Sequence, residues 1–359
     1  MEYQVTITET LSHIELVEAS SAIEAEDFVR DRYSKCDIVL NDTHFVATDF
    51  ETNQVVHNTS TLCRQPFLHP YYTSKKKDFQ LFNEDCFELL PHIEQQFDMI
   101  FADPPYFLSN NGFTVQSGEI VSVNKGEWDK GLSDEEMSAF NHRWIALCRE
   151  KLKDSGTIWV SGTYHNIFSV ANALKQNGFK ILNVITWAKT NPPPNISCRY
   201  FTYSTEFIIW ARKCEKVPHY YNYELMKHIN GDKQMRDVWN LPAIAPWEKS
   251  CGKHPTQKPL ALLSRIILAS TRPNEWILDP FAGSSTTGIA SNLLGRRYLG
   301  IEREKEFAAM GRKRREEIEN ISTYVSFRKK ISDIVKAEDT QTTFSLQENG
   351  GEDSLPFLK

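Results

Sequence analysis

The chain has 359 residues, of which 40% are hydrophobic and 12% aromatic, so it can form a large core and is neither fibrous nor wholly disordered. It contains no run of about eighteen apolar residues, and its first residues lack a basic segment followed by an apolar one. We therefore expect a soluble, cytoplasmic protein with no membrane-spanning segment. The seven cysteines are scattered and include no CxxC pair, which is typical of a reducing compartment.

The formal net charge of -6 is unevenly distributed along the chain. Residues 1–51 carry 12 acidic and 3 basic side chains, whereas residues 52–335 carry 36 basic and 30 acidic ones. A mildly basic body of this kind can bind a polyanion such as a nucleic acid, although a charge of this size does not establish such binding.

Residues 1–51 are predicted to form a small acidic β/α module. The sequence YQVTITET alternates as a strand does, residues 21–24 form a capping box that opens a helix to about Tyr33, and two strands follow at 37–40 and 45–50. The module shows no catalytic constellation, which favours a structural or docking role. Residues 52–77 are polar and rich in turn residues, which is typical of a linker.

From Phe79 onward, short apolar strands alternate with amphipathic helices, which predicts a doubly wound α/β fold with a mostly parallel sheet. The clearest helix runs from Ser133 to Lys153, because Ser133 and Glu136 can form a capping box. The domain is predicted to span residues 78–330, and the predicted strands are 79–83, 97–102, 157–162, 181–187, 205–211, 276–279 and 297–302. An aromatic- and proline-rich insertion is expected at about 189–253 and a polar, disordered tail at 331–359.

The tetrapeptide Asp103-Pro104-Pro105-Tyr106 directly follows the predicted strand at 97–102. Two prolines cannot continue a strand ladder and fix φ near -65°, so the strand must end in a rigid turn that holds the acid beside the aromatic ring. Such a ring can stack on a planar heterocycle while the carboxylate and a proline carbonyl accept hydrogen bonds from an exocyclic amine. An ordinary proline turn is the alternative, and the position at the end of a strand favours the functional interpretation.

A second motif, DPFAGSSTTG at residues 279–288, lies between a predicted strand and a predicted helix. Its small residues allow the backbone to approach a ligand, and the helix N-terminus offers free N–H groups. Glu302 ends the next predicted strand, where an acidic side chain typically accepts ribose hydroxyls. The motif indicates a site for a nucleoside-containing cofactor, with close packing of the backbone as the alternative.

These motifs occur together with EWDK at 127–130, WAKTNPPPN at 187–195, HPTQKP at 254–259 and a later GIERE. Their order resembles that of the β-class DNA amino-methyltransferases, which use S-adenosylmethionine and have a circularly permuted Rossmann-like fold in which DPPY precedes the cofactor loop. The similarity covers about residues 79–320 and is strongest to the second methyltransferases of DpnII-type restriction-modification systems, which methylate adenine N6 in GATC. Residues 1–51 resemble the small DpnD-like domain.

The resemblance implies roles for individual residues. The catalytic set is Asp103, Pro104, Pro105 and Tyr106: the carboxylate and the Pro104 carbonyl would hold the N6 amine, and the tyrosine ring would stack on the flipped adenine. Phe281, Gly283 and Ser284 would line the methionine moiety of the cofactor. The whole cofactor-binding set is Asp85, Asp103, Lys258, Asp279, Phe281, Ala282, Gly283, Ser284, Ser285, Thr286 and Glu302.

Two of these assignments have alternative interpretations, and at a third position the sequence differs from the family's pattern. Asp85 could instead be a helix N-cap for residues 86–96, and Lys258 could simply start the next helix. The family's loop usually reads FxGxG, and this chain has Ser285 at the second glycine. We expect the loop to tolerate a small serine, with a weakened or lost cofactor site as the alternative.

DNA contacts are expected in two segments. The loop between Asp103 and Ser133 is long and unpatterned and should close over the extruded base, with Trp128 either as a stacking ring or as a packing residue. Residues 189–258 carry 11 basic and 6 acidic side chains interleaved with aromatic ones, so sequence recognition is expected there, although core packing or solvated surface is the alternative for each residue. The candidate DNA contacts are Trp128, Arg199, Lys227, Lys233, Arg236 and Lys249.

The mechanism implied by the resemblance is direct in-line methyl transfer with no covalent enzyme intermediate. No cysteine lies near residues 103–106 in the sequence, which argues against attack on a base, and the spacing of Cys198, Cys214, Cys251 and His254 predicts no metal site. The alternatives are N4-methylation of cytosine, modification of a protein glutamine, and a non-catalytic DNA-binding module. The expected partners are DNA, a second copy of the chain in a homodimer, and a cognate restriction endonuclease that acts on the same site.

Overall fold

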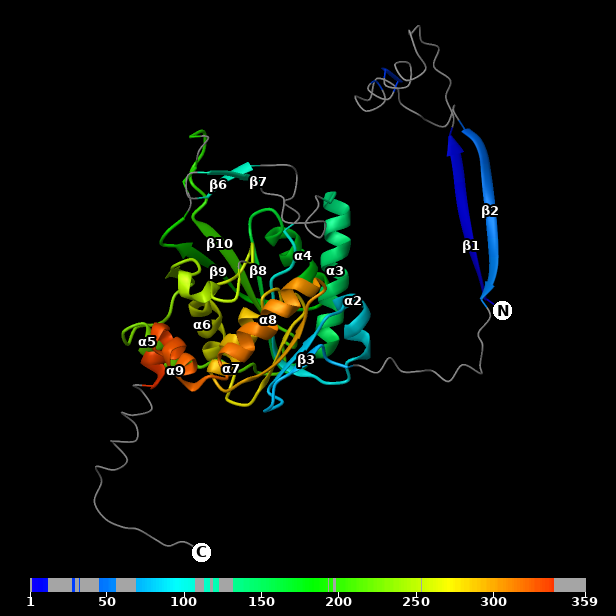
Figure 1. Cartoon of the computed structure of the whole chain (residues 1–359). Helices are drawn as coiled ribbons and strands as arrows, with labels where there is room; N and C mark the ends of the chain where they lie inside the picture. The colour runs from blue at the N-terminus through cyan, green and yellow to red at the C-terminus, as the bar shows by residue number, and fades with distance from the viewer. Residues whose placement is uncertain are drawn as a thin grey trace, which may run out of the picture. The chain divides into compact units, whose positions relative to one another are not determined.

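The computed structural model of the chain divides into two compact units, Met1–Leu68 and His69–Lys359 (Figure 1). The described residues are 2–11, 28–29, 32, 45–55, 69–106, 113–116, 119–122, 132–192, 194–195, 198–252 and 254–338.

The first unit contains two antiparallel strands, β1 (Glu2–Leu11) and β2 (Phe45–Val55), in which Glu2 pairs with Val55. Phe28, Val29 and Arg32 are helical, as expected for the helix of this unit. The capping box at 21–24 and the strand expected at 37–40 lie outside the described residues. Because β2 continues to Val55, the first residues of the predicted linker belong to a strand.

The second unit is built on a nine-stranded sheet in the order β11-β9-β10-β8-β5-β12-β13-β4-β3. Two strands, β3 and β10, run antiparallel to their neighbours, and the remaining pairs in the sheet are parallel. This arrangement confirms the predicted mostly parallel α/β sheet. The strand bounds are β3 Tyr72–Thr73, β4 Phe79–Phe82, β5 Phe97–Ala102, β8 Leu152–Gly162, β9 Lys180–Lys189, β10 Thr205–Arg212, β11 Val238–Leu241, β12 Trp276–Asp279 and β13 Arg297–Ile301, with a separate hairpin of β6 Phe113–Gln116 and β7 Glu119–Ser122.

Helices cover both faces of this sheet, because successive strand residues point to opposite sides. In β5, Met99 and Phe101 belong to one buried hydrophobic cluster, whereas Phe97 and Ile100 belong to the other. One cluster is covered by α2 Cys86–Leu89, the 3-10 helix η2 Leu90–His92, α3 Asp134–Lys151 and α4 Ile167–Gln176. The other is covered by α5 Tyr223–Ile229, α6 Leu260–Ser270, α7 Thr286–Leu293, α8 Lys305–Glu317 and α9 Ile321–Lys330.

The capping box predicted for α3 is present. The Glu136 N–H donates to the Ser133 hydroxyl oxygen over 3.2 Å, and the Ser133 N–H donates to the Glu136 carboxylate over 2.9 Å. The helix ends at Lys151, because Leu152 already begins β8. The helix expected after Asp85 is only the short α2 followed by η2.

Three predicted boundaries change in the folded chain. Tyr72 and Thr73 form the edge strand β3, so the end of the predicted linker belongs to the second unit. The predicted insertion contributes β11 to the sheet and buries Trp239 in the core. Ile331 and Ile334 of the predicted tail are buried as well. The tail and insertion look polar overall, but a few apolar side chains at the right spacing are enough to attach them to the core.

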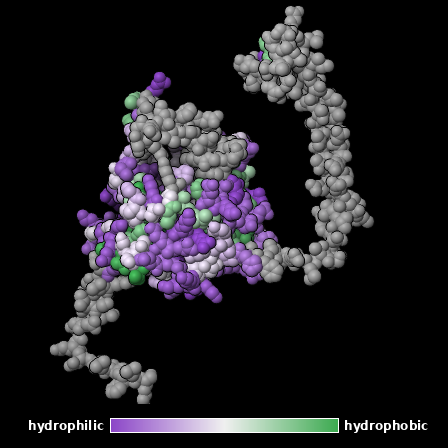
Figure 2. All heavy atoms as spheres, viewed as in Figure 1, coloured by the Kyte–Doolittle hydropathy of each residue, from purple (hydrophilic) through white to green (hydrophobic). Residues whose placement is uncertain are grey.

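The surface of the second unit that carries α8 is predominantly hydrophilic (Figure 2). None of the described helices is long and apolar enough to cross a bilayer.

Candidate active site

Six acidic residues line one cavity, and four of them lie at the carboxyl ends of neighbouring parallel strands. Asp85 follows β4, Asp103 follows β5, Asp279 ends β12, and Glu302 follows β13. The cavity has a volume of about 480 Å³, which is within the range of small-molecule sites. The crevice outside the carboxyl ends of an open α/β sheet is where such folds bind ligands, and the sheet brings these four residues together from distant parts of the chain.

The Asp103 carboxylate is held on both of its oxygens. Its Oδ1 accepts hydrogen bonds from the Tyr106 hydroxyl, over 2.7 Å, and from the Ser161 hydroxyl at the end of β8. Its Oδ2 accepts from the Lys258 ammonium, with Nζ at 2.5 Å. Although burial by itself raises the pKa of the Asp103 carboxyl, the Lys258 charge and the three hydrogen bonds outweigh it and hold the pKa below its usual range.

Lys258 is buried at the turn before α6 and stays charged. Burial alone lowers the pKa of an ammonium, but the carboxylates of Asp103 and Glu206 outweigh that effect and raise the pKa of Lys258. The ion pair with Asp103 shows that Lys258 does more than start a helix. The sequence predicted only that Lys258 lies near the cofactor; in the structure it pairs with the Asp103 carboxylate.

Tyr106 is 6% exposed, and its ring does not line the cavity, whereas Pro105 does. The Lys258 Nζ lies 5.2 Å from the ring centroid. Stacking of Tyr106 on a target base therefore stays a prediction, and it requires the ring to become accessible.

The turn after β12 approaches the cavity closely. Asp279 Oδ1 accepts the N–H of Phe281 over 3.1 Å, and Glu302 Oε2 accepts the N–H of Gly283 over 2.6 Å. Gly283 has φ of +51° and faces His254, so a side chain at this position would be both strained and crowded. The residues of this turn and of the start of α7 that line the cavity are Asp279, Pro280, Phe281, Ala282, Gly283, Ser284, Thr286 and Thr287.

Ser285 does not line the cavity. Its backbone is left-handed, with φ of 59° and ψ of 35°, which is the conformation that a glycine would adopt most easily. Its side chain is fully buried and faces Gly311 of α8, where there is no β-carbon to collide with it. The departure from FxGxG therefore points away from the cavity.

Two positioning residues were missed in the sequence. Arg314 of α8 is buried, and its Nη1 donates to the Ser284 carbonyl over 2.8 Å and to the Thr286 hydroxyl over 2.8 Å. Arg314 stands in a run of basic residues, and nothing in the sequence singled it out from its neighbours. Ser161 is the penultimate residue of the strand TIWVSG, and its place near a carboxyl end was the only signal that could have identified it.

Another part of the cavity wall combines the acid Asp85 with the aromatic rings of Phe87 and Phe281. Asp85 Oδ1 accepts the N–H of Phe87 over 2.8 Å as the N-cap of α2, and Asp85 also lines the cavity, so both of its expected roles are compatible with the structure. The Phe281 ring lies edge-on to Trp144, with centroids 5.4 Å apart. Cys86 also lines the cavity, but burial raises the pKa of its thiol to about 12, so it is protonated and a poor nucleophile at neutral pH.

Residues 97–313 match the family described as DNA methylase, which groups N6 and N4 methyltransferases, and residues 3–48 match the family described as DpnD/PcfM-like protein. The chain belongs to the DNA methylase family.

The methyltransferase is 60% identical over 252 residues to the type II methyltransferase M2.MboI of Moraxella bovis, covering 70% of this chain and 92% of that relative. It is 57% identical over 249 residues to M2.DpnII of Streptococcus pneumoniae, covering 69% and 92%. The crystal structure of the M1.HpyAVI–SAM complex aligns with a TM-score of 0.51 and 31% identity over 66% of this chain and 98% of that one. These likenesses confirm the predicted family, the fold and S-adenosylmethionine as the methyl donor.

The cavity of the methyltransferase suits such a donor. Its volume is sufficient, and its wall combines carboxylates at Asp85 and Glu302 with apolar rings at Phe87 and Phe281. Burial raises the pKa of Glu302, and burial raises the pKa of Asp279 to about 7.

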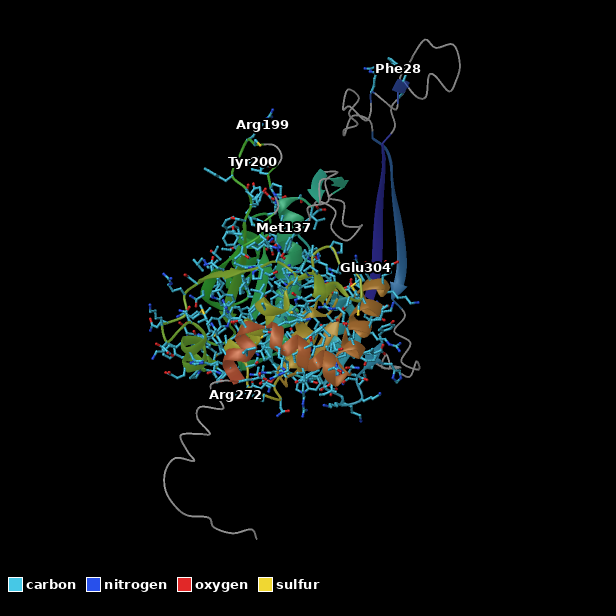
Figure 3. All side chains as sticks on the ribbon, turned by 60° about the vertical axis from the view of Figure 1, so that its left-hand side comes forward. Phe28, Met137, Arg199, Tyr200, Arg272 and Glu304 are labelled. Carbon is cyan, nitrogen blue, oxygen red and sulfur yellow. The ribbon has the colours of Figure 1, made fainter. Side chains whose placement is uncertain are left out.

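The candidate DNA-binding residues are not all at the catalytic edge of the methyltransferase. Arg199 lies in the connection between β9 and β10, which begins and ends at the edge of the sheet that carries Asp103. In Figure 3, Arg199 and Tyr200 project from one end of the unit, and Arg272 lies at the other end. Lys249 is exposed in the 3-10 helix η4 (Pro246–Lys249), which is joined to the start of α6 because Glu248 accepts the N–H of Leu260 over 2.7 Å.

The other candidates lie elsewhere. Lys227 is on α5, which begins where the Asn222 N–H donates to the Ala269 carbonyl at the far end of α6. Lys233 and Arg236 are exposed on the connection from α5 to β11. The structure does not bring these three together with Asp103. Trp128 lies outside the described residues, so its role stays a prediction.

Proposed function

We propose that this chain is the type II methyltransferase of a restriction-modification system and methylates adenine N6 within GATC. The observation that carries the proposal is that the turn at Asp103 and the turn at Gly283 line one cavity although they are far apart in sequence. The likeness to M2.MboI and M2.DpnII supports the choice of adenine and of GATC.

In this proposal different cavity residues bind different parts of the methyl donor. Glu302 accepts the ribose hydroxyls and Asp85 accepts the amine of the donor's adenine, because each has a carboxylate at the cavity wall. The backbone around Gly283 and Ser284 lies beside the methionine part. Ser285 acts only on the shape of the turn. When bound, S-adenosylmethionine supplies an electrophilic methyl group.

The methyl acceptor is the N6 amine of an extruded adenine, held by the Asp103 carboxylate and the Pro104 carbonyl. These acceptors orient the nitrogen lone pair, and the carboxylate stabilises the positive charge that develops on the nitrogen. Since the pKa of Asp103 lies below its usual range, the carboxylate is a weak base, and the amine proton passes on to water.

DNA is bound at the catalytic edge in this proposal. Arg199 and Lys249 supply cations there. Exposed aromatic rings occupy the same β9–β10 connection as Arg199: Phe201 is 96% exposed, and Tyr203 stacks on Tyr164 with centroids 5.1 Å apart. Basic side chains interleaved with exposed rings suit an unstacked nucleic acid. The DNA contacts expected for Trp128, Lys227, Lys233 and Arg236 stay predictions.

The remaining parts of the proposal concern partners and location. The substrate places the enzyme with the bacterial nucleoid in the cytoplasm. A cognate endonuclease would act on the same site without having to bind the methyltransferase, and a homodimer stays a prediction.

The test is a methylation assay with radiolabelled S-adenosylmethionine on GATC-containing duplexes, followed by mass spectrometry of the nucleosides. Asp103→Ala should abolish transfer and leave the cofactor Kd within about threefold, because Asp103 acts on the target amine. Asp98→Asn is the matched control: it changes an acid at the other end of β5 that pairs with Lys153 at 2.7 Å, and it should keep wild-type kcat.

N4-methylcytosine as the product would refute the choice of base, and methylation only at other sequences would refute GATC. Equal loss of transfer and cofactor binding in Asp103→Ala would refute the role given to Asp103.

A further inference from the structure

The ion pair at the catalytic carboxylate continues into a buried row of alternating charges. Lys258 Nζ lies 2.5 Å from Asp103 Oδ2 and 3.8 Å from Glu206 Oε2, and Glu206 Oε1 in turn accepts from Lys189 Nζ over 2.6 Å. All four side chains are 20% exposed or less. Glu206 is the second residue of β10 and pairs in the sheet with Trp187 of β9. Lys258 therefore lies between two carboxylates, only one of which it bonds.

Glu206 Oε2 is a buried acceptor that makes no hydrogen bond. Leaving such an oxygen unsatisfied costs roughly 1–3 kcal/mol, so native proteins rarely do so without a reason. The other oxygen of the same carboxylate is occupied by Lys189, and the cation within ion-pair distance of Oε2 is Lys258. A movement of the ammonium of about 1 Å would give Oε2 a hydrogen bond.

By contrast, all the hydrogen bonds that the Asp103 carboxylate accepts come from side chains of the enzyme itself. Tyr106 and Ser161 donate to Oδ1, and Lys258 donates to Oδ2. A target amine needs a carboxylate oxygen as its acceptor, and its nitrogen becomes positive as it takes the methyl group. An ammonium on the same oxygen opposes that developing charge, because it neutralises the carboxylate that should stabilise it.

We propose that Lys258 has two positions, on Asp103 in the free enzyme and on Glu206 Oε2 once the target amine has entered, and that Glu206 is the positioning residue that receives it. The exchange rests on the proposed function, since it needs an amine as the incoming group. No covalent bond forms or breaks in it, and the ammonium keeps its three protons in both positions. The buried positive charge remains paired throughout, which is the condition for moving it at low cost.

Two variants of the full chain separate this role from a structural one. Glu206→Gln keeps the shape of the side chain and removes its charge, so the ammonium stays on Asp103; the single-turnover rate of methyl transfer should fall at least about tenfold, with the Kd values for S-adenosylmethionine and DNA within about threefold. Lys189→Met, the matched control, breaks the other ion pair of Glu206 but leaves Oε2 in place, and it should keep the rate within about threefold of wild type.

A structure of the wild-type enzyme with DNA and S-adenosylhomocysteine gives a second, independent test. The expected result is Lys258 Nζ within about 3.2 Å of Glu206 Oε2 and farther from Asp103 Oδ2. A wild-type rate in Glu206→Gln, equal loss of rate in both variants in step with a lower Tm, or an unmoved Lys258 in the ternary complex would each overturn the exchange. Whether the wild-type chain produces N6-methyladenine in the same assay decides the proposed function separately.

Discussion

At the scale of single residues, the site concentrates buried carboxyl groups at one edge of the sheet, and Asp279 shows the consequence. The pKa of Asp279 is raised to about 7 by burial, which outweighs the hydrogen bonds from Thr287 and from the Phe281 N–H. In the unfolded chain the same carboxyl ionises near pH 4. Between these two pH values the folded state binds one proton more than the unfolded state.

The free energy of unfolding should therefore fall as pH rises from 4 to 7 and level off above that. The fall should be on the order of 4 kcal/mol, because the pKa of Asp279 is shifted by about three units. Asp279→Asn has no titrating carboxyl and should lose this part of the pH dependence, so that it is more stable than wild type at pH 8. Denaturant unfolding of both proteins at pH 5.5 and pH 8 measures the difference in the free energy of unfolding. Asp232→Asn, in an exposed turn, should keep the wild-type profile. Parallel profiles for wild type and Asp279→Asn would contradict the assignment.

Ser285 is the other informative residue. A left-handed backbone at a non-glycine residue costs roughly 1–2 kcal/mol. The chain tolerates it because the side chain fills the space that Gly311 leaves open. Ser285 stands where the family's loop usually has a glycine, and its side chain fits because Gly311 on α8 has no β-carbon.

At the scale of elements, α8 holds the cofactor turn in place. Arg314 reaches from this helix to Ser284 and Thr286 on the turn and the start of α7, and burial lowers the pKa of its guanidinium to about 10 without discharging it at neutral pH. Hydrogen bonds from a charged donor contribute about 1.5–3 kcal/mol each, so the helix and the turn form one unit.

Arg314→Met should weaken S-adenosylmethionine binding about tenfold and lower the Tm, because the carbonyl and hydroxyl oxygens that it satisfied lose their donor. Arg312→Met, on the exposed side of the same helix, removes an exposed pair with Glu316 and a contact with the Tyr72 ring, and it should change neither quantity appreciably. Isothermal titration calorimetry and thermal unfolding measure both. A folded Arg314→Met with wild-type cofactor affinity would show that the turn holds its shape without α8.

At the scale of the whole molecule, the second unit builds its hydrophobic core from its own described residues. The described residues of both buried hydrophobic clusters lie between Phe79 and Ile334, all within the second unit. Catalysis and folding of the second unit should therefore not depend on residues 1–68.

A chain of residues 69–359 should keep kcat within about twofold of the full chain, and the Tm of its main transition should change by less than about 2 °C, which corresponds to under roughly 1 kcal/mol. Methylation kinetics and scanning calorimetry on both chains test this. A tenfold loss of kcat in a stably folded truncated chain would show that the first unit takes part in methylation.

Sequence reasoning worked where the signal is local. Two adjacent prolines must end a strand, a serine and a glutamate three residues apart can cap a helix, and short apolar runs between amphipathic segments form parallel strands. The order of the motifs then identified the family. It did not work for Ile331 and Ile334, which were assigned to a disordered tail, because a polar segment can be attached to a core by a few apolar side chains.

The amino-acid sequence by itself determined the mostly parallel α/β fold and the methyl donor. It also predicted the roles of the turns at Asp103 and Gly283, because each turn is a motif of residues that are neighbours in the chain. Only the tertiary structure decided that Ser161 and Lys258 bond to Asp103, that Glu206 lies beside Lys258, and that Arg314 donates to Ser284 and Thr286. Those contacts join strands and helices that are distant in sequence, and the energy of a buried charge depends on what the fold places within a few ångströms of it.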